Sequence, residues 1–184
     1  MAASESALVL LVPEAEALVK SFRDSHDPSA AKGMPAHITL LYPFRPLDAI
    51  DASVLAGLRQ CFASFAPFAF ALAATRRFES PEAVLYLEPA PAGPFRALTE
   101  AIWQRHPETP AYRGTNADVI PHLSVAQVHD LPQLDVIAER FAPTAAAMLP
   151  IRAMAAEVAL MDTRSGRWQV GTTFGLGSTA SSST

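Results

Sequence analysis

Apolar residues form two kinds of pattern, one typical of strands and one typical of helices, which follow each other along the chain. Short apolar or alternating runs predict strands at residues 7–12, 35–44, 68–78, 83–87, 121–127, 151–161 and 167–176. Between them, apolar residues three and four positions apart predict helices that begin near Pro13, Asp51, Gly93 and Asp130. The polar segment 24–33 should end the first helix, and the last two strands should form a hairpin around residues 162–166.

The same order of elements occurs twice along the chain. Each half reads as strand, helix, histidine-bearing strand, helix, strand, turn and strand. In both halves 44 residues separate the histidine from the turn, from His37 to Pro81 and from His122 to Gly166. The repeat predicts an α+β fold with two related lobes of antiparallel sheet and flanking helices, arranged about a pseudo-two-fold axis and a central cleft. We expect one bilobal domain over residues 1–177 and a disordered tail over residues 178–184.

The strand at residues 35–44 carries polar side chains on one face. Because side chains alternate along a strand, we predict one face made of His37, Thr39 and Leu41, and an opposite, buried face made of Ile38, Leu40 and Tyr42. The imidazole and the hydroxyl lie roughly 6–7 Å apart along such a strand. One bound anion can therefore reach both groups.

A second copy of this pattern appears at residues 121–127. There His122, Ser124 and Ala126 should share a face, with Leu123 and Val125 behind them. With 14 Ser and 11 Thr in the chain, two His-X-Ser/Thr triplets are not unusual by composition alone. Their weight comes from context, because both triplets lie in strand-like runs and occupy equivalent places in the repeat.

Composition limits the classes of partner. The net charge is −4, and no basic cluster is larger than Arg76-Arg77, which disfavours duplex nucleic acid as a ligand but leaves a small nucleotide or an RNA end. The single Cys61 excludes internal disulfides and fits a reducing compartment. The first apolar run is too short for a signal or a membrane span. We expect a cytoplasmic monomer that does not bind membranes.

With these motifs, the sequence resembles the two-histidine phosphoesterases, which include the 2′-5′ RNA ligase-like proteins and the RNA 2′,3′-cyclic phosphodiesterases. The resemblance rests on the strings HITLLYPF from His37 and PHLSVA around His122, and on the closing SGRW…FGLG hairpin. It covers residues 7–177, nearly the whole chain. It implies that His37 and His122 are catalytic and that Thr39 and Ser124 bind the substrate phosphate.

The chemistry of these residues suits that role. Opening a cyclic phosphodiester needs a base to activate water and an acid to protonate the leaving oxygen, and imidazole can do either near neutral pH. The hydroxyls of Thr39 and Ser124 can donate to the non-bridging oxygens as charge develops on them. The two motifs contain no carboxylate or thiolate, so we expect neither a metal nor another cofactor. The motifs do not show which histidine is the base.

Several alternatives remain open at this stage. The enzyme alternatives are 2′-5′ RNA ligation, opening of ADP-ribose cyclic phosphate and oligoadenylate cleavage, and the non-enzyme alternative is a nucleotide-binding module without turnover. Isolated histidines of this kind would by default only satisfy hydrogen bonds in the core, but the repeat and the resemblance favour the catalytic interpretation over that one. Candidate specificity residues are Tyr112, Arg113, Arg76, Arg77 and Arg164.

The other three histidines and the cysteine have simpler explanations. We expect His26 and His129 on the surface, and His106 as a favourable positive charge at the end of a helix. Cys61 should be a small core thiol beside the apolar face of its helix.

Overall fold

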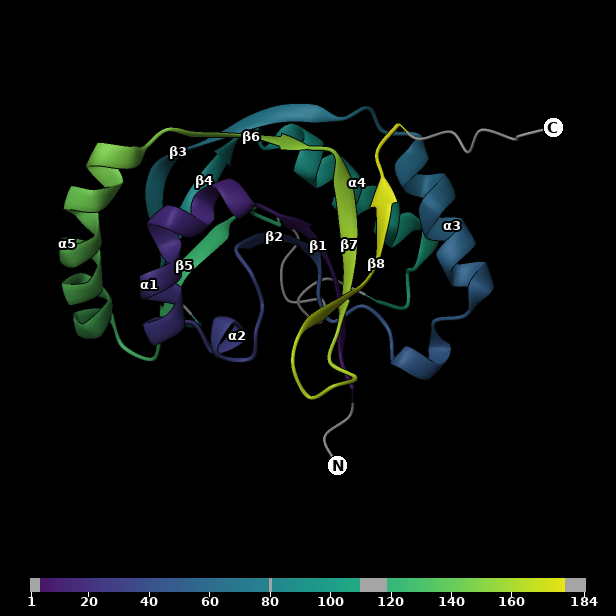
Figure 1. The fold of residues 1–184 in the computed structure, drawn as a ribbon, viewed down its shortest axis with the longest axis horizontal. Coiled ribbons are helices and arrows are strands. Elements are labelled where there is room, and N and C mark those ends of the chain that lie inside the picture. Colours follow the sequence, from purple (N-terminus) through teal and green to yellow (C-terminus); the bar gives the residue numbers. More distant parts are fainter. Residues whose placement is uncertain (1–3, 80, 110–118, 178–184) are drawn as a thin grey trace.

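Two four-stranded antiparallel sheets form the centre of the protein (Figure 1). The structure is a computed structural model that describes residues 4–79, 81–109 and 119–177. Sheet A has the strand order β2-β1-β7-β8, and its strands are β1 (Ser6–Leu11), β2 (His37–Leu41), β7 (Glu157–Asp162) and β8 (Gln169–Gly175). Sheet B has the order β5-β4-β3-β6, and its strands are β3 (Phe68–Phe78), β4 (Ala83–Ala90), β5 (Leu123–Val128) and β6 (Ile151–Ala155).

Helices flank the two sheets and begin where the sequence supplies caps. They are α1 (Glu16–His26), α2 (Pro28–Ala31), α3 (Ala52–Ala63), α4 (Gly93–Arg105) and α5 (Leu131–Met148), with short 3₁₀ turns at Pro13–Ala15 and Leu47–Ala49. The Asp51 carboxylate accepts from the backbone N–H of Val54, and the Asp130 carboxylate accepts from that of Gln133. Each cap satisfies an N–H that has no partner within its helix.

The helix before each histidine strand packs on the sheet that contains the other histidine strand, whereas the helix after it packs on the sheet of its own histidine strand. Helix α1 packs on β5 in sheet B and is joined there by α5, whereas α4 packs on β2 in sheet A and α3 on β8 (Figure 1). Strands β7 and β8, from the end of the chain, complete the sheet that begins with β1 and β2. The predicted α+β fold with two related antiparallel lobes is thus confirmed, and the lobes share one continuous apolar core.

Two element boundaries differ from the sequence-based expectation. The segment 24–33 was expected only to end the first helix, but α1 continues to His26 and a separate helix α2 follows, capped by Asp27. The run 151–161 was expected to be one strand of a hairpin. It divides at Ala156 into β6, which pairs with β3 in sheet B, and β7, which pairs with β8 in sheet A. Apolar periodicity does not show that a run passes from one sheet to another.

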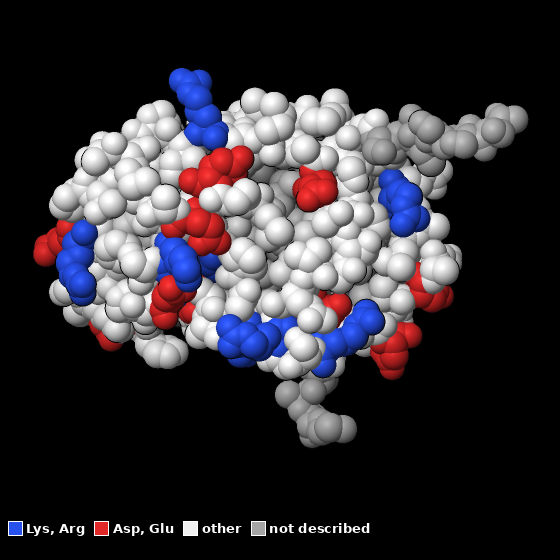
Figure 2. All heavy atoms as spheres, in the orientation of Figure 1, with Lys and Arg blue, Asp and Glu red and all other residues white. Residues whose placement is uncertain are grey.

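Charge is unevenly distributed over the face seen in Figure 2. Lys and Arg side chains gather along its lower edge, where Figure 1 places α2 and the loop between β7 and β8. Lys32, which follows α2, lies close to this edge of the fold because its carbonyl accepts from the N–H of Trp168 at the start of β8. Among the described residues, no helix combines the length and the hydropathy that crossing a bilayer requires.

Candidate active site

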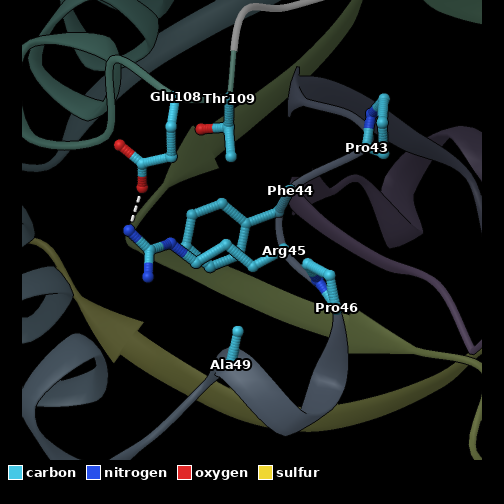
Figure 3. A pocket seen from close by; sticks show the side chains of 7 residues that line it. All are labelled: Pro43, Phe44, Arg45, Pro46, Ala49, Glu108 and Thr109. Atoms are coloured by element: carbon cyan, nitrogen blue, oxygen red, sulfur yellow. Dashed lines mark hydrogen bonds and ion pairs between the residues drawn. The ribbon is translucent and has the colours of Figure 1, made fainter.

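The described residues form several surface hollows, and the two histidine motifs meet in one of them. Another, about 530 Å³, is a wide depression near Phe44 and Arg45 (Figure 3). The positively charged side chain in its wall, Arg45, forms an ion pair with Glu108. No histidine lines this hollow in the described part of the chain, and its walls are otherwise mainly apolar. Size alone therefore does not identify the site.

The second hollow, which we call the histidine cavity, has a volume of about 270 Å³ and lies where the two sheets approach each other. All four residues singled out by the repeat line it: His37 and Thr39 from β2, His122 directly before β5, and Ser124 within β5. Its remaining wall is formed by Glu5, Ala7, Val9, Asp27, Pro28, Ser29, Lys32, Met34, Tyr42, Gln127 and Trp168. The structure thus brings the two motifs, 85 positions apart in the sequence, to one cavity.

A β-bulge follows the hydroxyl residue in each motif. Leu8 pairs with Leu41 and Val9 with Thr39, so Leu40 is an extra residue in β2. The same shift occurs in sheet B, where Leu85 pairs with Ala126 and Tyr86 with Ser124, so Val125 is extra in β5. The two halves therefore share the bulge as well as the motif.

These bulges correct the predicted strand faces. Leu41 and Ala126 were expected beside the histidines, but both are buried in the main core. The extra residue reverses the alternation beyond it, so the next residue in each motif, Tyr42 or Gln127, lines the cavity instead. The expectation of strict alternation along each strand did not place either of these residues in the cavity.

Both imidazoles are held in the same orientation. Nδ1 of His37 lies 2.8 Å from the carbonyl oxygen of Pro35, and Nδ1 of His122 lies 2.8 Å from that of Ile120. Because a carbonyl can only accept, each Nδ1 carries the proton and each neutral ring presents Nε2 as an acceptor. Within the described residues, neither Nε2 and neither hydroxyl of Thr39 and Ser124 has a hydrogen-bond partner.

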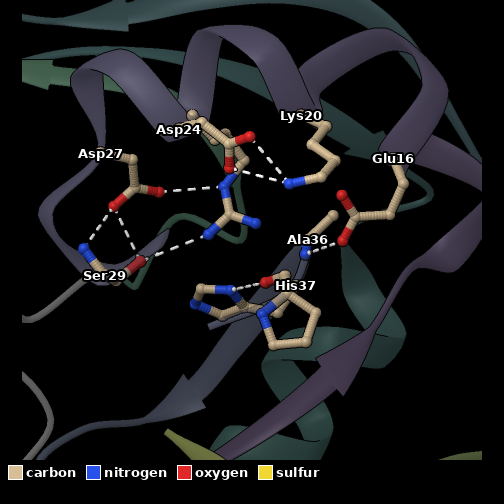
Figure 4. Close-up of polar contacts among 9 residues, drawn as sticks. Glu16, Lys20, Asp24, Asp27, Ser29, Ala36 and His37 are labelled. Atoms are coloured by element: carbon tan, nitrogen blue, oxygen red, sulfur yellow. Dashed lines mark hydrogen bonds and ion pairs between the residues drawn. The ribbon is translucent and has the colours of Figure 1, made fainter. Parts of the chain in front are cut away.

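A buried ion pair lies beside His37 (Figure 4). Arg23 Nε donates to Asp27 Oδ2 over 3.0 Å, and both side chains are only 3% exposed. Asp27 also accepts from the backbone N–H and the hydroxyl of Ser29, and Arg23 Nη2 donates to that hydroxyl. This network joins the end of α1 to α2 and fixes one wall of the cavity. The sequence shows the i, i+4 spacing of the pair but not its burial or its proximity to His37.

Burial lowers the pKa of both cavity histidines. The pKa of His37 falls to about 4, first because its imidazole is densely surrounded by protein and next because the Arg23 cation is close. The hydrogen bond to the Pro35 carbonyl and the Asp27 carboxylate act in the opposite direction but do not outweigh these effects. Burial also lowers the pKa of His122, opposed by the hydrogen bond to Ile120. In the unliganded protein both rings are therefore neutral at pH 7.

Aromatic rings support His122 from the side of sheet B. Phe78 and Tyr86 stack with ring centroids 4.3 Å apart. Each meets the His122 ring edge-on, at 5.1 Å and 5.5 Å respectively. Neither aromatic residue lines the cavity, so their contribution is to fix the imidazole plane.

The structure does not bring the predicted specificity residues to the described cavity wall. Arg76 pairs with Glu88, and Arg77 pairs with Asp135 on α5. Arg164 lies in the turn of the β7–β8 hairpin, 3.5 Å from an oxygen of Asp162. Tyr112 and Arg113 lie outside the described residues.

The histidines outside the motifs and the cysteine also lie away from the cavity. His129 is exposed, as expected, and Cys61 is a buried free thiol. His106 was expected to act as a positive charge at the end of α4, but it is only 7% exposed and burial lowers its pKa, so the neutral ring is favoured. Across the described ranges, no three His, Cys, Asp or Glu side chains are grouped closely enough to hold a metal ion.

Comparison with known proteins places this geometry in a family. The family model described as the 2′-5′ RNA ligase superfamily matches residues 11–167, which include both motifs. The chain belongs to this superfamily. It is also 30% identical over 111 residues to a protein of Bacillus pumilus (strain SAFR-032) named "Putative phosphoesterase". That match covers 60% of this chain and 61% of the length of the relative.

Solved structures share the fold at low sequence identity. The chain superposes on Escherichia coli LigT complexed with 3′-AMP with a TM-score of 0.59 and 13% identity, over 96% of this chain and 99% of the other. It superposes on TT0787 of Thermus thermophilus with a TM-score of 0.61 and 19% identity, over 94% and 98% of the two chains. The family and the fold therefore agree.

Proposed function

We propose that this protein is a metal-independent phosphodiesterase that hydrolyses 2′,3′-cyclic phosphates at RNA ends or on small nucleotides. The observation that carries the proposal is the matched pair of motifs in one cavity. Each motif supplies an imidazole with Nδ1 anchored to a carbonyl and a hydroxyl two residues later. An in-line displacement at phosphorus needs a proton acceptor and a proton donor on opposite sides and hydrogen-bond donors for the phosphoryl oxygens.

The proposed reaction uses only groups of this chain and water. One Nε2 takes a proton from water as its oxygen bonds to phosphorus, and the other imidazolium Nε2 gives a proton to the ribose oxygen as the P–O bond breaks. The hydroxyls of Thr39 and Ser124 donate to the non-bridging oxygens. The product is a nucleoside monophosphate or an RNA end that carries a 2′- or 3′-phosphate. Proton exchange with solvent then restores both rings.

We assign the base to His37 and the acid to His122. Arg23 holds a fixed positive charge near His37, which disfavours a second cation there and keeps that ring neutral. His122 has aromatic neighbours, and burial is the principal cause that lowers its pKa. A bound phosphate anion raises the pKa of both rings, and His122 is then the easier one to protonate.

The relatives support the proposal without deciding it. The E. coli LigT structure contains 3′-AMP, one of the two products that opening of an adenosine 2′,3′-cyclic phosphate can give. The same cavity would suit 2′-5′ RNA ligation, opening of ADP-ribose cyclic phosphate, oligoadenylate cleavage or nucleotide binding without turnover. Turnover is favoured over binding alone because both proton-transfer groups are present and one motif supplies each.

The decisive experiment is an assay with resolved product isomers. Nucleoside 2′,3′-cyclic phosphates, cyclic-phosphate-ended oligonucleotides and ADP-ribose cyclic phosphate are incubated with the protein in EDTA. We expect turnover of 2′,3′-cyclic ends, reduced by at least about 100-fold in H37A and H122A. The exposed His129 provides the control H129A, which should keep wild-type turnover. Wild-type rates in H37A or H122A, or activity that EDTA abolishes and zinc or manganese restores, would overturn the proposal.

A further inference from the structure

One part of the histidine cavity extends from the catalytic pair along β1. Val9 on β1 is the cross-strand partner of Thr39, and the wall continues from it to Ala7 and to Glu5, which directly precedes β1. These three residues share one face because residues two apart in an extended chain point to the same side. On the side of sheet B, the Phe78 and Tyr86 rings pack against His122. A substrate anchored between the two motifs therefore has room for its remaining part along β1.

The walls of this extension are apolar and aromatic. Val9, Ala7, Met34 and Trp168 belong to a small cluster of buried side chains that is separate from the main core. The Tyr42 and Trp168 rings meet edge to face with centroids 6.0 Å apart. Such walls suit a flat heterocycle better than a hydrated polar group.

The loop before β2 is anchored so that these walls stay together. The N–H of Trp168 donates to the carbonyl of Lys32 over 2.8 Å, which ties the loop between α2 and β2 to the start of β8. Gly33 has a φ of +93°, in the left-handed region that favours glycine, and an added Cβ would lie 3.3 Å from Arg167 Nε. Met34 is thereby held opposite β1 as part of a preformed wall.

A carboxylate closes the far end of the extension. Glu5 Oε1 accepts from the Tyr42 hydroxyl over 2.9 Å, and the Glu5 backbone N–H donates to Thr163 Oγ1 over 2.8 Å. A negative group in a cavity for a phosphate ester opposes binding unless the ligand offers it hydrogen-bond donors. An ionised carboxylate only accepts, so it selects for N–H groups.

We propose that Glu5, Tyr42, Met34 and Trp168 form a nucleobase subsite that selects guanine. Guanine presents two adjacent donors, N1–H and N2–H, to a carboxylate, whereas uracil offers one N–H between two carbonyl oxygens. From Val9, beside the phosphate donor Thr39, to Glu5 is four residues, or about 13 Å along the strand, which leaves room for a ribose and a base. The inference rests on the proposed function and names its preferred substrate, a guanosine 2′,3′-cyclic phosphate.

Turnover of the four nucleoside 2′,3′-cyclic phosphates tests this subsite. We expect the highest kcat/KM for the guanosine substrate. The E5Q variant keeps a carbonyl for the Tyr42 hydroxyl but loses the charge, so kcat/KM for guanosine should fall about 10-fold or more, as for a hydrogen bond to a charged group. The value for uridine should change by less than about twofold, because uridine does not pair with both oxygens. Glu14, exposed in the 3₁₀ turn after β1, provides the matched control E14Q.

Binding measurements separate failure of the subsite from failure of the proposed function. Calorimetry with 3′-GMP and 3′-UMP on the wild type and E5Q, with thermal unfolding to confirm that E5Q is folded, needs no turnover. Tighter binding of 3′-GMP that E5Q abolishes supports the subsite even if no cyclic phosphate is hydrolysed. Equal kcat/KM for all four bases, or an equal loss for guanosine and uridine in E5Q, overturns the subsite and leaves hydrolysis intact.

Discussion

Arg23 and Asp27 form a nearly dry ion pair, with Nε and Oδ2 3.0 Å apart and both side chains 3% exposed, beside the His37 imidazole. A buried pair contributes little net stability, because desolvation offsets much of the attraction, but breaking it leaves one charge unpaired. Here the pair orders the junction of α1 and α2 and places a cation near His37. Together with the Phe78 and Tyr86 rings beside His122, it makes the surroundings of the two histidines differ.

The Arg23 charge should control the acidic limb of the pH profile. Arg23 lowers the pKa of His37, so R23Q should raise that pKa and move the acidic limb of kcat/KM to higher pH. R23K keeps a cation and should move the limb much less. Because R23Q leaves Asp27 unpaired, it should also lower the free energy of unfolding by about 3–5 kcal/mol. An acidic limb that stays in place in folded R23Q would contradict the assignment of His37 as the base.

Substrate binding should shift the pH optimum. kcat/KM reports the pKa values of the free protein, and those of His37 and His122 are both lowered, so its bell should centre below pH 6.5. The bound phosphate anion raises both pKa values, so the bell for kcat should lie at higher pH. Both limbs belong to the coupled pair. Superimposable profiles for kcat and kcat/KM would show that the substrate charge does not act on these rings.

The hydroxyls of Thr39 and Ser124 should affect rate without titrating. T39V and S124A each remove one donor to the phosphoryl oxygens, and we expect kcat to fall about 10²-fold or more for each. The limbs of the pH profile should keep their positions, because a hydroxyl does not ionise in this range. A shift of a limb by a full unit in either variant would point instead to an effect on the imidazoles. S25A, which removes an exposed hydroxyl on α1 that bonds to Ser21 O and does not line the cavity, is the control for loss of a serine hydroxyl.

Acid should destabilise the fold partly through His37. Its pKa is about 4 when folded and about 6.5 when unfolded, so the unfolded chain binds more protons between these values. Stability is therefore lost as the pH falls from 6.5 towards 4, by at most about 3 kcal/mol and less where solvent reaches the ring. Urea unfolding at pH 7 and pH 5 should show a smaller loss in H37Q than in the wild type. The exposed variant H129Q should keep the wild-type loss, and an equal loss in H37Q would refute the lowered pKa.

The bulge in β2 should depend on a hydrogen bond from α4. Thr99 Oγ1 donates over 3.1 Å to the carbonyl of Leu40, the extra residue of the bulge, and Thr99 is buried. T99V preserves shape but leaves that carbonyl without this donor, and it should lower the free energy of unfolding by about 1–3 kcal/mol. Turnover should fall as well, because the bulge positions Thr39 and Tyr42. The control variant S64A removes the hydrogen bond to Cys61 O on α3 and should leave turnover unchanged. If T99V and S64A had equal turnover, the bulge would not be needed for catalysis.

Much of the framework could be predicted from the sequence because it depends on local periodicity and on a repeat. The apolar runs placed most of the strands and helices, the caps at Asp51 and Asp130 are as expected, and the equal spacing in the two halves predicted two related lobes. The motifs around His37 and His122 identified four residues that the structure brings to one cavity. These features depend on residues close together in the sequence or on a comparison of its two halves, so they can be recognised in the sequence alone.

Only the tertiary structure decided how these elements meet. Helices α1 and α4 each pack on the sheet that contains the other half's histidine strand, and the run at residues 151–161 divides between the two sheets, because burial of apolar faces is non-local. The bulges at Leu40 and Val125 turned Tyr42 and Gln127 into the cavity, since one extra residue reverses every side chain beyond it. The sequence determined which groups carry the proposed chemistry. Long-range packing placed Arg23 where it lowers the pKa of His37, and it placed Glu5 and Trp168 in the wall of the same cavity.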